Sequence, residues 1–558
     1  MDFNGTDDKD TSDDNSLYDI DGETFNYNYD IEFNSKILEK MNGYKIIYLK
    51  NRFNKPIENL PSIIQNLRFG DYFNQSVNNL PSSLQEITFG YSFNQCVDNL
   101  PFNLQTITFG YCFNNPVENL PPNLQIITFG NDFNQPVNNL SKDLKKLKFG
   151  NRFNQPVDNL PLGLQEITFG CDFNQTVDNL PFNLQTITFG YCFNNPVENL
   201  PPNLQEIIFG DNFNQPVDNL PKDLKKLKFG NKFNQPVDNL PLGLQEITFG
   251  CWFNQIINNL PSKLKYIKFK KSSYFNQSID KLPSGVKILL LGECFDKTVD
   301  NLPLYLEIIR FGYNFNQCVD NLPSTLKDIT FGYSFNQRVD NLPLELESIT
   351  FGKSFNNFVE NLPPRLQSLT FDDDFNQKVN NLPKGIKNLN FGCQFNKKVN
   401  NLPLELQNLK FGDNFNKRVN NLPPKLENIE FSWNFNKRVD NLPSGLKNLM
   451  FKFLFNKPVD NLPKDLVNLT FGDYFNQNVD NLPSGLKSLI FGRNFNQNVD
   501  NLPKELKYLE IGCHFNKTLL NLPVGLEKIY LTRFCCSSEI EEHDYRNIPN
   551  LEIIYIKG

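Results

Sequence analysis

The sequence has few of the residues that usually build a reactive centre. Its 558 residues include only 2 His, 2 Trp and 3 Met. No apolar run approaches the roughly 18 residues that a membrane-spanning helix needs. The chain does not begin with a basic segment followed by an apolar core, so we expect no secretory signal peptide. These absences predict an intracellular, cytoplasmic protein that is not secreted and does not bind membranes.

Motifs for metal binding and catalysis are also missing. The 11 cysteines are odd in number and follow no disulfide framework, so free thiols are expected. Cys535 and Cys536 with His543 lack the paired spacing of a zinc site, and His514 stands alone. No phosphate-binding loop or nucleophile elbow is found. We therefore predict no catalytic residue, no metal and no cofactor, and hence a protein that is not an enzyme.

Charge is distributed unevenly along the chain. The net charge is −7, but residues 1–30 contain ten acidic residues against Lys9 alone. The rest of the chain is therefore close to neutral, which does not indicate the basic surface that neutralises phosphates. We expect no nucleic-acid partner.

A 20-residue repeat fills most of the chain. Phe-Asn recurs every 20 residues from Phe53 to Phe253 and, after a two-residue insertion, from Phe275 to Phe515, which makes 24 units. Numbered from this Phe as position 1, the consensus is F-N-x-x-V-x-N-L-P-x-x-L-x-x-I-x-F-G-x-x. Positions 1 and 17 hold 45 of the 53 Phe residues, which indicates that the aromatic side chains stack along one core.

The spacing of apolar residues predicts a mainly β solenoid of about 24 coils. Positions 12 to 17 suit a short strand, and positions 1, 5, 8, 12, 15 and 17 point inward. Twenty residues leave no room for a full helix, and the Pro at position 9 disfavours one. We expect a parallel sheet on one face, an extended or 3₁₀ return path and little or no α-helix. The Gly at position 18 is expected to relax the backbone where the chain leaves the strand.

The repeat also sets the expected domain boundaries. Residues 1–30 are expected to form an acidic disordered tail. A degenerate capping repeat follows at 31–52, and the solenoid covers 53–532, with an insertion at 270–274. Residues 533–558 are expected to contain an irregular segment and a closing half-repeat, because the open ends of a stack must face water.

The motifs Phe153-Asn-Gln-Pro-Val157 and Leu482-Pro-Ser-Gly-Leu486 carry a family resemblance. The first resembles the FNIP repeat of social amoebae and of amoeba-infecting giant viruses. The second resembles the strand segment of leucine-rich repeats. The resemblance implies a leucine-rich-repeat-like solenoid, located in the host cytoplasm if the source is viral. Many FNIP proteins resemble ubiquitin-ligase adaptors with an F-box, but residues 1–50 lack the helical pattern of an F-box.

Two Asn columns, at positions 2 and 7, must satisfy their amides. We expect them to form ladders between coils, the alternative being a solvent-facing ligand stripe. The Thr residues frequent at position 16 resemble an ice-binding array, but Lys148, Lys228 and Arg310 interrupt them, so β-propensity is the better explanation. At position 14, Asn occurs in five consecutive units, from Asn388 to Asn468, and predicts a surface ladder.

One stretch of the outward positions 14 and 16 departs from this polar pattern. Apolar, aromatic and basic residues on three adjacent coils make a candidate partner-binding patch: Tyr266, Lys268, Ile288, Leu290, Ile308 and Arg310. The alternative is that the insertion bends the stack and covers these side chains locally.

The leading interpretation is a non-enzymatic protein–protein interaction scaffold. Its partner is a protein, and a monomer is favoured over an obligate oligomer. Two alternatives stay open: a structural, virion-associated rod, or the substrate receptor of a ubiquitin ligase without a recognisable F-box.

Overall fold

The protein is described from a computed structural model that covers residues 18–28, 31–533, 548 and 551–557. The chain forms two compact units, Met1–Phe275 and Asn276–Gly558. Each unit is a stack of 20-residue coils, and each coil contributes one short strand. The chain makes about 26 turns in total, because degenerate coils add to the 24 regular ones predicted.

The strands of both units follow one another at the predicted interval. In the first unit they are β1 (Tyr18–Asp21), β2 (Thr24–Tyr27), β3 (Ile46–Leu49), β4 (Asn66–Phe69), β5 (Glu86–Thr88), β6 (Thr106–Thr108), β7 (Ile126–Thr128), β8 (Lys146–Lys148), β9 (Glu166–Thr168), β10 (Thr186–Thr188), β11 (Glu206–Ile208), β12 (Lys226–Lys228), β13 (Glu246–Phe249) and β14 (Tyr266–Phe269). In the second unit they are β15 (Ile288–Leu290), β16 (Ile308–Arg310), β17 (Asp328–Thr330), β18 (Ser348–Thr350), β19 (Ser368–Thr370), β20 (Asn388–Asn390), β21 (Asn408–Lys410), β22 (Asn428–Phe431), β23 (Asn448–Phe451), β24 (Asn468–Thr470), β25 (Ser488–Ile490), β26 (Tyr508–Ile511), β27 (Lys528–Arg533) and β28 (Glu552–Lys557).

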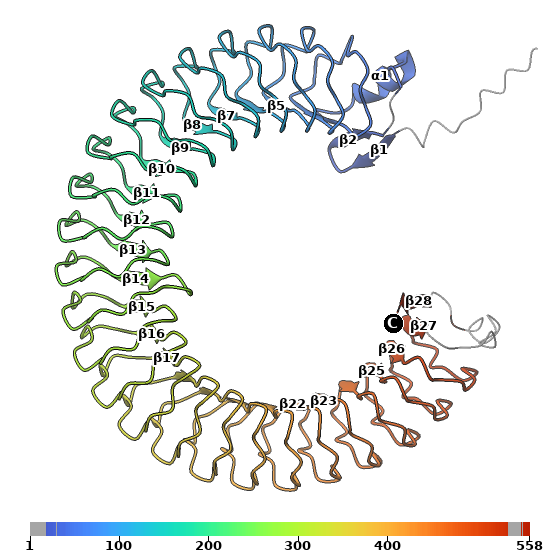
Figure 1. Ribbon diagram of the computed structural model, residues 1–558. Helices are drawn as coiled ribbons and strands as arrows, with labels where there is room; N and C mark the ends of the chain where they lie inside the picture. The colour runs from blue at the N-terminus through green and yellow to red at the C-terminus, as the bar shows by residue number, and fades with distance from the viewer. Residues whose placement is uncertain (1–17, 29–30, 534–547, 549–550, 558) are drawn as a thin grey trace, which may run out of the picture. The chain divides into compact units, whose positions relative to one another are not determined.

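Within each unit, the strands of successive coils from β2 onward pair in parallel and in register with the repeat. Thr186 of β10, for example, lies opposite Glu166 of β9 and Glu206 of β11. In each unit the strands lie on the inner side of the curve and the turns on the outer side (Figure 1). The return path is extended and is folded by turns with i→i+3 hydrogen bonds, such as Leu164 N–H to Pro161 O at 3.1 Å. The predicted mainly β solenoid is therefore confirmed.

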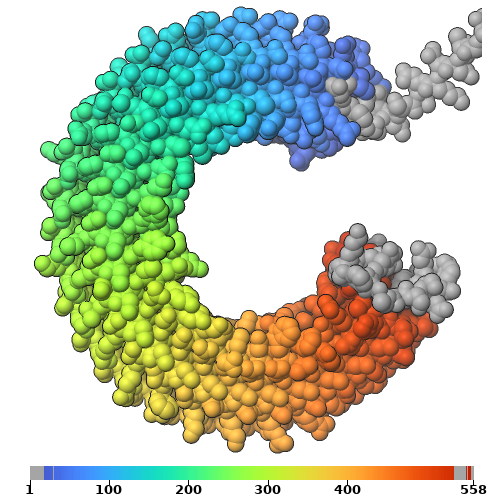
Figure 2. All heavy atoms as spheres, in the orientation of Figure 1, coloured from blue at the N-terminus to red at the C-terminus, as the bar shows by residue number. Residues whose placement is uncertain are grey.

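The six predicted inward positions form the core. In the coil that starts at Phe153, the side chains at positions 1, 5, 8, 12, 15 and 17 are all at most 6% exposed. Rings at position 1 stack on the next coil, with centroids 6.1 Å apart for Phe153 and Phe173, and Phe149 lies 3.6 Å from Phe153. Each buried side chain contributes about 1.5–3 kcal/mol. In the space-filling view, successive coils of each unit pack directly against one another (Figure 2).

The Gly at position 18 has a different role from the one predicted. It is not a relaxed backbone position, since among the described glycines only Gly22 has a positive φ, of 58°. Position 18 is instead where successive coils approach most closely. A Cβ on Gly110 would lie 1.6 Å from the carbonyl oxygen of Gly90, and one on Gly332 would lie 1.5 Å from that of Gly312. Glycine avoids this clash in most coils. Four of the other coils have a larger residue at the same position: Lys270, Asp372, Ser432 and Lys452.

The Asn at position 2 joins its coil to the coil that follows. Its side-chain oxygen accepts the backbone N–H of the next position-2 residue, as in Asn174 N–H to Asn154 Oδ1 at 2.9 Å. The Gln at position 3 adds a second donor, since Gln175 Nε2 lies 3.2 Å from the same oxygen. At position 7 the Asn amide donates to position 6 of the preceding coil, as in Asn179 Nδ2 to Asp158 Oδ1 at 3.1 Å. Both columns therefore form inter-coil ladders, although the partners are backbone and carboxylate groups rather than stacked amides.

The N-terminal end differs from the expected disordered tail. β1 and β2 form an antiparallel hairpin, and β2 pairs in parallel with β3. Residues 18–27 therefore belong to the sheet, whereas residues 1–17 lie outside the described ranges. In the capping repeat, α1 (Ser35–Met41) occupies the return path, and Asn34 Oδ1 accepts the N–H of Ile37 as its N-cap. The sequence pattern missed both the hairpin and the helix because acidic and polar residues dominate this region.

The other irregular regions are partly described. β28 pairs in parallel with β27, so the closing half-repeat predicted near Leu551 extends the sheet of the second unit. The irregular segment predicted around 533–546 lies almost wholly outside the described residues. At the insertion, Ser273 is buried, and Lys270 replaces the usual glycine. Its Nζ lies 2.8 Å from Asn231 Oδ1.

No membrane-crossing helix is found in the described part of the chain, where α1 is 7 residues long.

Candidate protein-binding face

The strand face of each unit is formed by positions 14 and 16. These side chains alternate with the buried residues at positions 15 and 17, and most are half-buried, as at Glu166 and Thr168 of β9. Opposite charges on adjacent strands pair on this face, for example Lys146 with Glu166 at 2.8 Å. The face is therefore a regular surface, and a coil with different side chains at positions 14 and 16 presents a different local surface.

The structure places the first two predicted patch residues in the first unit. Tyr266 and Lys268 lie on β14, opposite Glu246 and Thr248 of β13. Tyr266 is half-buried, and Lys268 is exposed. Both side chains occupy the outward positions that the alternation predicted.

The other four predicted patch residues belong to the second unit. Ile288 lies opposite Ile308, and Leu290 lies opposite Arg310, on β15 and β16. Arg310 is exposed, whereas the three aliphatic side chains are half-buried like most of this face. The structure thus groups the six residues as a pair and a set of four. Their role in binding a partner stays a prediction.

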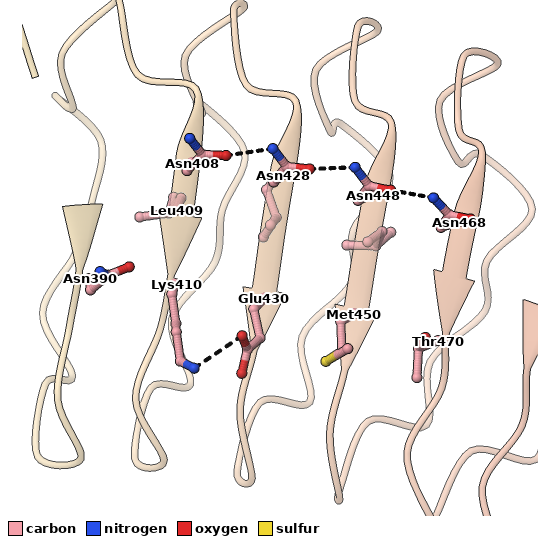
Figure 3. A pocket seen from close by; sticks show the side chains of 12 residues that line it. Asn390, Asn408, Leu409, Lys410, Asn428, Glu430, Asn448, Met450, Asn468 and Thr470 are labelled. Atoms are coloured by element: carbon pink, nitrogen blue, oxygen red, sulfur yellow. Dashed lines mark hydrogen bonds and ion pairs between the residues drawn. The ribbon is translucent and has the colours of Figure 1, made fainter. Parts of the chain in front are cut away.

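The second unit also has a hollow on its strand face that the sequence analysis did not predict. It extends over β20 to β24, has a volume of about 400 Å³ and is shown in Figure 3. Its lining consists of Asn390, Asn408, Leu409, Lys410, Asn428, Ile429, Glu430, Asn448, Leu449, Met450, Asn468 and Thr470.

One side of the hollow is a ladder of Asn side chains at position 14. Asn408 Nδ2 donates to Asn388 Oδ1 at 2.6 Å, and Asn468 Nδ2 donates to Asn448 Oδ1 at 2.5 Å. Asn428 donates to Asn408 and accepts from Asn448 in the same direction. The surface ladder predicted from the sequence is confirmed. Each rung keeps a second N–H and an oxygen lone pair that a ligand can engage.

The opposite side of the hollow carries an ion-pair cluster. Glu430 Oε2 lies 3.1 Å from Lys410 Nζ, and Glu430 Oε1 lies 2.8 Å from Lys452 Nζ. Burial alone would raise the pKa of Glu430, but the hydrogen bonds from Lys452 and Lys410 outweigh it and hold the pKa below its ordinary value. The carboxylate therefore stays charged at neutral pH and acts as a fixed acceptor.

The floor between these two sides is apolar. Met450 on β23 supplies its exposed apolar side chain, whereas Leu409, Ile429 and Leu449 at position 15 belong to the core beneath it and are at most 3% exposed. Met450 is 39% exposed, and its flexible thioether adapts to varied apolar groups. The hollow can thus accommodate an apolar side chain and hydrogen-bond the polar groups around it. Within the described ranges, no cluster of His, Cys, Asp and Glu could hold a metal ion.

Three aromatic residues follow the strands next to this hollow. Trp433 and Tyr474 are 50% and 48% exposed. The ring of Phe453 lies 4.8 Å from that of Trp433 and 4.9 Å from that of Tyr474. Exposed, mutually packed aromatic rings are typical anchors at protein interfaces.

Among the described residues, the thiols and His514 have no arrangement that indicates catalysis. The Sγ of Cys393 donates to Asp413 Oδ2 at 3.6 Å. The neighbouring carboxylate of Asp373, together with burial and Asp413, raises the pKa of Cys393 to about 12. The thiol is therefore protonated at neutral pH and unreactive. His514 Nδ1 lies 2.8 Å from Asn494 Oδ1 at the surface. His543, Cys535 and Cys536 lie outside the described residues.

The sequence contained only part of the signal for the hollow. The run of Asn at position 14 was interpreted only as a ladder and was not connected with Lys410, Glu430 and Met450 at position 16 of the same coils. The aromatic residues at positions 19 and 20 could have been found by a comparison of coils.

Comparisons with known proteins agree with this architecture. The fold is a leucine-rich-repeat-like β-solenoid. The FNIP repeat family matches residues 76–112, 136–172, 193–232, 233–272, 295–334, 319–354, 355–394 and 478–514, and the chain therefore belongs to the FNIP-repeat family. No curated protein sequence matches significantly.

Among solved structures, the chain is similar to CroV588 of the giant virus CroV, which is described as a novel circular leucine-rich-repeat protein. The identity is 33% over 97% of this chain and 100% of that chain, with a TM-score of 0.76. YopM from Yersinia enterocolitica is 18% identical over 91% of each chain, with a TM-score of 0.37. A chain of the Toll–Spatzle complex from Drosophila is 13% identical over 91% of this chain and 87% of that one, with a TM-score of 0.46. The last two TM-scores are too low to support any shared property.

Proposed function

We propose that this chain is a non-enzymatic scaffold that binds a protein partner through the strand face of its second unit. The observation that carries the proposal is the hollow over β20 to β24. It combines the exposed apolar side chain of Met450, a ladder of Asn amides and an ion pair on one sheet.

The physical chemistry of the hollow favours a protein ligand. An apolar side chain of a partner would replace water over Met450, and burial of about 100 Å² of apolar surface contributes about 2.5 kcal/mol. The Asn rungs would hydrogen-bond to the partner's backbone, which gives orientation. Trp433 and Tyr474 would extend the contact beyond the hollow.

The test is affinity purification of the tagged chain from its native cells, with a single change in the hollow. Met450→Asp places a charge on the apolar floor, and we expect recovery of the partner to fall at least tenfold. Thr186→Asp, at an outward position of the first unit, is the matched control and should change recovery by less than twofold. Partner recovery is measured by quantitative mass spectrometry.

Three outcomes would contradict the proposal. Equal recovery by both variants, with unchanged melting temperatures, would show that the hollow is not the binding site. Recovery of only the chain itself would favour a structural rod, and recovery of ligase subunits would favour a ubiquitin-ligase receptor.

The two parts of the predicted patch are tested in the same experiment. We propose that the pair on β14 and the set of four on β15 and β16 each contribute to partner binding, with Tyr266 and Arg310 as their respective anchors. Tyr266→Ala tests the first part and the double variant Leu290→Ala and Arg310→Ala tests the second, and each should reduce recovery without unfolding the chain. Unchanged recovery by either variant would exclude that part while leaving the hollow as the binding site.

A further inference from the structure

The turn that follows position 1 becomes strongly basic in part of the second unit. Eight basic residues occupy positions 3 and 4 of five consecutive coils, and we name them the basic stripe. They are Lys378, Lys397, Lys398, Lys417, Arg418, Lys437, Arg438 and Lys457. The position-4 members are exposed, and those at position 3 are half-buried. In the first unit, the coils that start at Phe73 through Phe253 have no basic residue at either position.

The lysines at position 3 replace a residue that supports the scaffold. Gln at this position donates to the Asn of the preceding coil, as Gln377 Nε2 does to Asn356 O at 2.9 Å and to Asn356 Oδ1 at 3.2 Å. Among the described residues, Lys397, Lys417 and Lys437 have no such bond and no ion pair. Lysine in place of Gln therefore loses this hydrogen bonding between coils and leaves its ammonium group without an ion pair to any described residue. Such a loss of stability is expected where a surface serves binding.

The carboxylates that would neutralise the stripe are also missing from its centre. Where position 6 is Asp, it pairs with the basic residue at position 4, as Arg338 does with Asp340 at 2.9 Å. In three coils of the stripe, position 6 is instead Asn380, Asn400 or Asn420. Lys378, Lys398 and Arg418 thus have no carboxylate at position 6 of their own coil, the position from which Asp340 neutralises Arg338.

The result is a local excess of positive charge in a negatively charged protein. Residues 376–460 contain 14 Lys and Arg against 6 Asp and Glu, a local charge of +8 within a chain of net charge −7. The position-1 rings that precede these residues lie 6.0–6.1 Å apart between coils, so the five coils place their charges along about 24 Å. A row of this length fits an extended segment of about seven residues, at about 3.3 Å per residue.

We propose that the basic stripe binds an extended segment of a partner protein that is rich in Asp and Glu. The inference rests on the proposed scaffold function, because it assigns a chemistry to part of the same partner. Charge complementarity accelerates such an association and fixes its register. A single-stranded nucleic acid is less favoured, because stacking on aromatic rings is typical of such sites and positions 3 and 4 of these coils hold none.

The test uses the purified full-length chain and a fluorescent peptide of 15 glutamates, with a peptide of 15 glutamines as the neutral probe. The variant Lys397→Gln, Lys417→Gln, Lys437→Gln and Lys457→Gln introduces the Gln that other coils have at position 3. Because that residue restores the inter-coil bond, the variant should fold at least as stably as the parent. We expect its dissociation constant for the glutamate peptide to rise at least tenfold, measured by fluorescence anisotropy.

The matched control removes the same number of charges from the first unit. The variant Lys142→Gln, Lys145→Gln, Lys222→Gln and Lys225→Gln changes the net charge equally, and its dissociation constant should stay within twofold of the parent. Equal loss in both variants would overturn the proposal, because binding would then follow net charge alone. Equal binding of the glutamine peptide would overturn it as well.

A 15-nucleotide oligothymidylate identifies the other class of ligand. If it binds the stripe at least tenfold more tightly than the glutamate peptide, the stripe is a nucleic-acid site and the proposal is wrong. Met450→Asp should not change peptide binding, because the hollow does not include the stripe. If the peptide test fails, the proposed scaffold function is not affected. If the Met450→Asp capture experiment fails, the proposed binding of an acidic segment by the basic stripe is not affected.

Discussion

The coils of the two units have the same pattern of core residues but different surface residues. Phe153 in the first unit and Phe415 in the second are both fully buried, and the Phe stacks have the same spacing of about 6 Å in both. Between the coils that start at Phe133 to Phe253 and those that start at Phe375 to Phe455, positions 3, 4, 6, 14 and 16 are among those that differ. The comparison teaches that the buried apolar positions are kept while outward positions vary, including positions 3 and 14, which also form hydrogen bonds between coils.

The largest expected loss of stability comes from substitutions at position 18, which test the packing that the two units have in common. Gly190→Ala in the first unit and Gly332→Ala in the second each place a Cβ within 1.7 Å of a carbonyl oxygen of the preceding coil. We expect a loss of stability on the order of 3 kcal/mol in either unit, as for other overpacked sites. Hydrogen exchange of the flanking coils measures it.

A glycine at position 11 gives the control for this prediction. In Gly485→Ala, the new Cβ would meet its nearest atom, Lys464 O, at 3.8 Å. This variant should lose little stability. Equal protection in all three variants would show that the close approach at position 18 does not limit the fold.

A smaller effect tests how the surfaces differ. Asn428→Ala removes both ladder bonds that this residue makes with Asn408 and Asn448. We expect a loss of about 1 kcal/mol, since each partly exposed hydrogen bond contributes little. Thr186→Ala, at the same position in the first unit, should cost less, because no side-chain hydrogen bond is described for it. Chemical denaturation followed by circular dichroism compares the two, and a larger loss for Thr186→Ala would contradict the ladder's role.

The smallest effect concerns reactivity rather than stability. Cys171 and Cys393 occupy the same position 19 in the two units. With a pKa of about 12, only about one in 10⁴ of the Cys393 thiols is ionised at pH 8. We therefore expect iodoacetamide to modify exposed Cys171 much faster than Cys393, as followed by mass spectrometry. Asp373→Asn removes the main cause of the raised pKa and should accelerate modification of Cys393. An unchanged rate would sink this explanation.

Much of the fold could be predicted from the sequence, because two dozen copies of one pattern leave few alternatives. The inward set seen at Phe153, Val157 and Ile167 follows from spacing alone, and so does the ladder from Asn388 to Asn468. The role of Gly110 could not be predicted in this way. A sequence does not reveal how closely two coils approach, so the need for glycine was assigned to the backbone angle instead.

The surface was harder to predict because it is defined by departures from the pattern. Charge averaged over the chain hid the basic stripe, and our expectation of no basic surface was wrong for residues 376–460. The hairpin of β1 and β2 was missed for a related reason. It pairs with β3 through backbone groups, which the acidic composition of residues 1–30 does not reveal.

The link from each Asn at position 2 to the following coil has a consequence for how such a chain changes length. Most junctions between coils use the same acceptor, the same Phe stack and the same glycine, so most coils can follow one another, with exceptions at Lys270, Leu291 and Asp296. Residues 97–125 and 177–205 are identical. Unequal recombination between their coding sequences would delete or add four coils in one event and create no junction that the protein does not already contain. Descendants of this gene can therefore differ in the number of coils while each remains a folded stack.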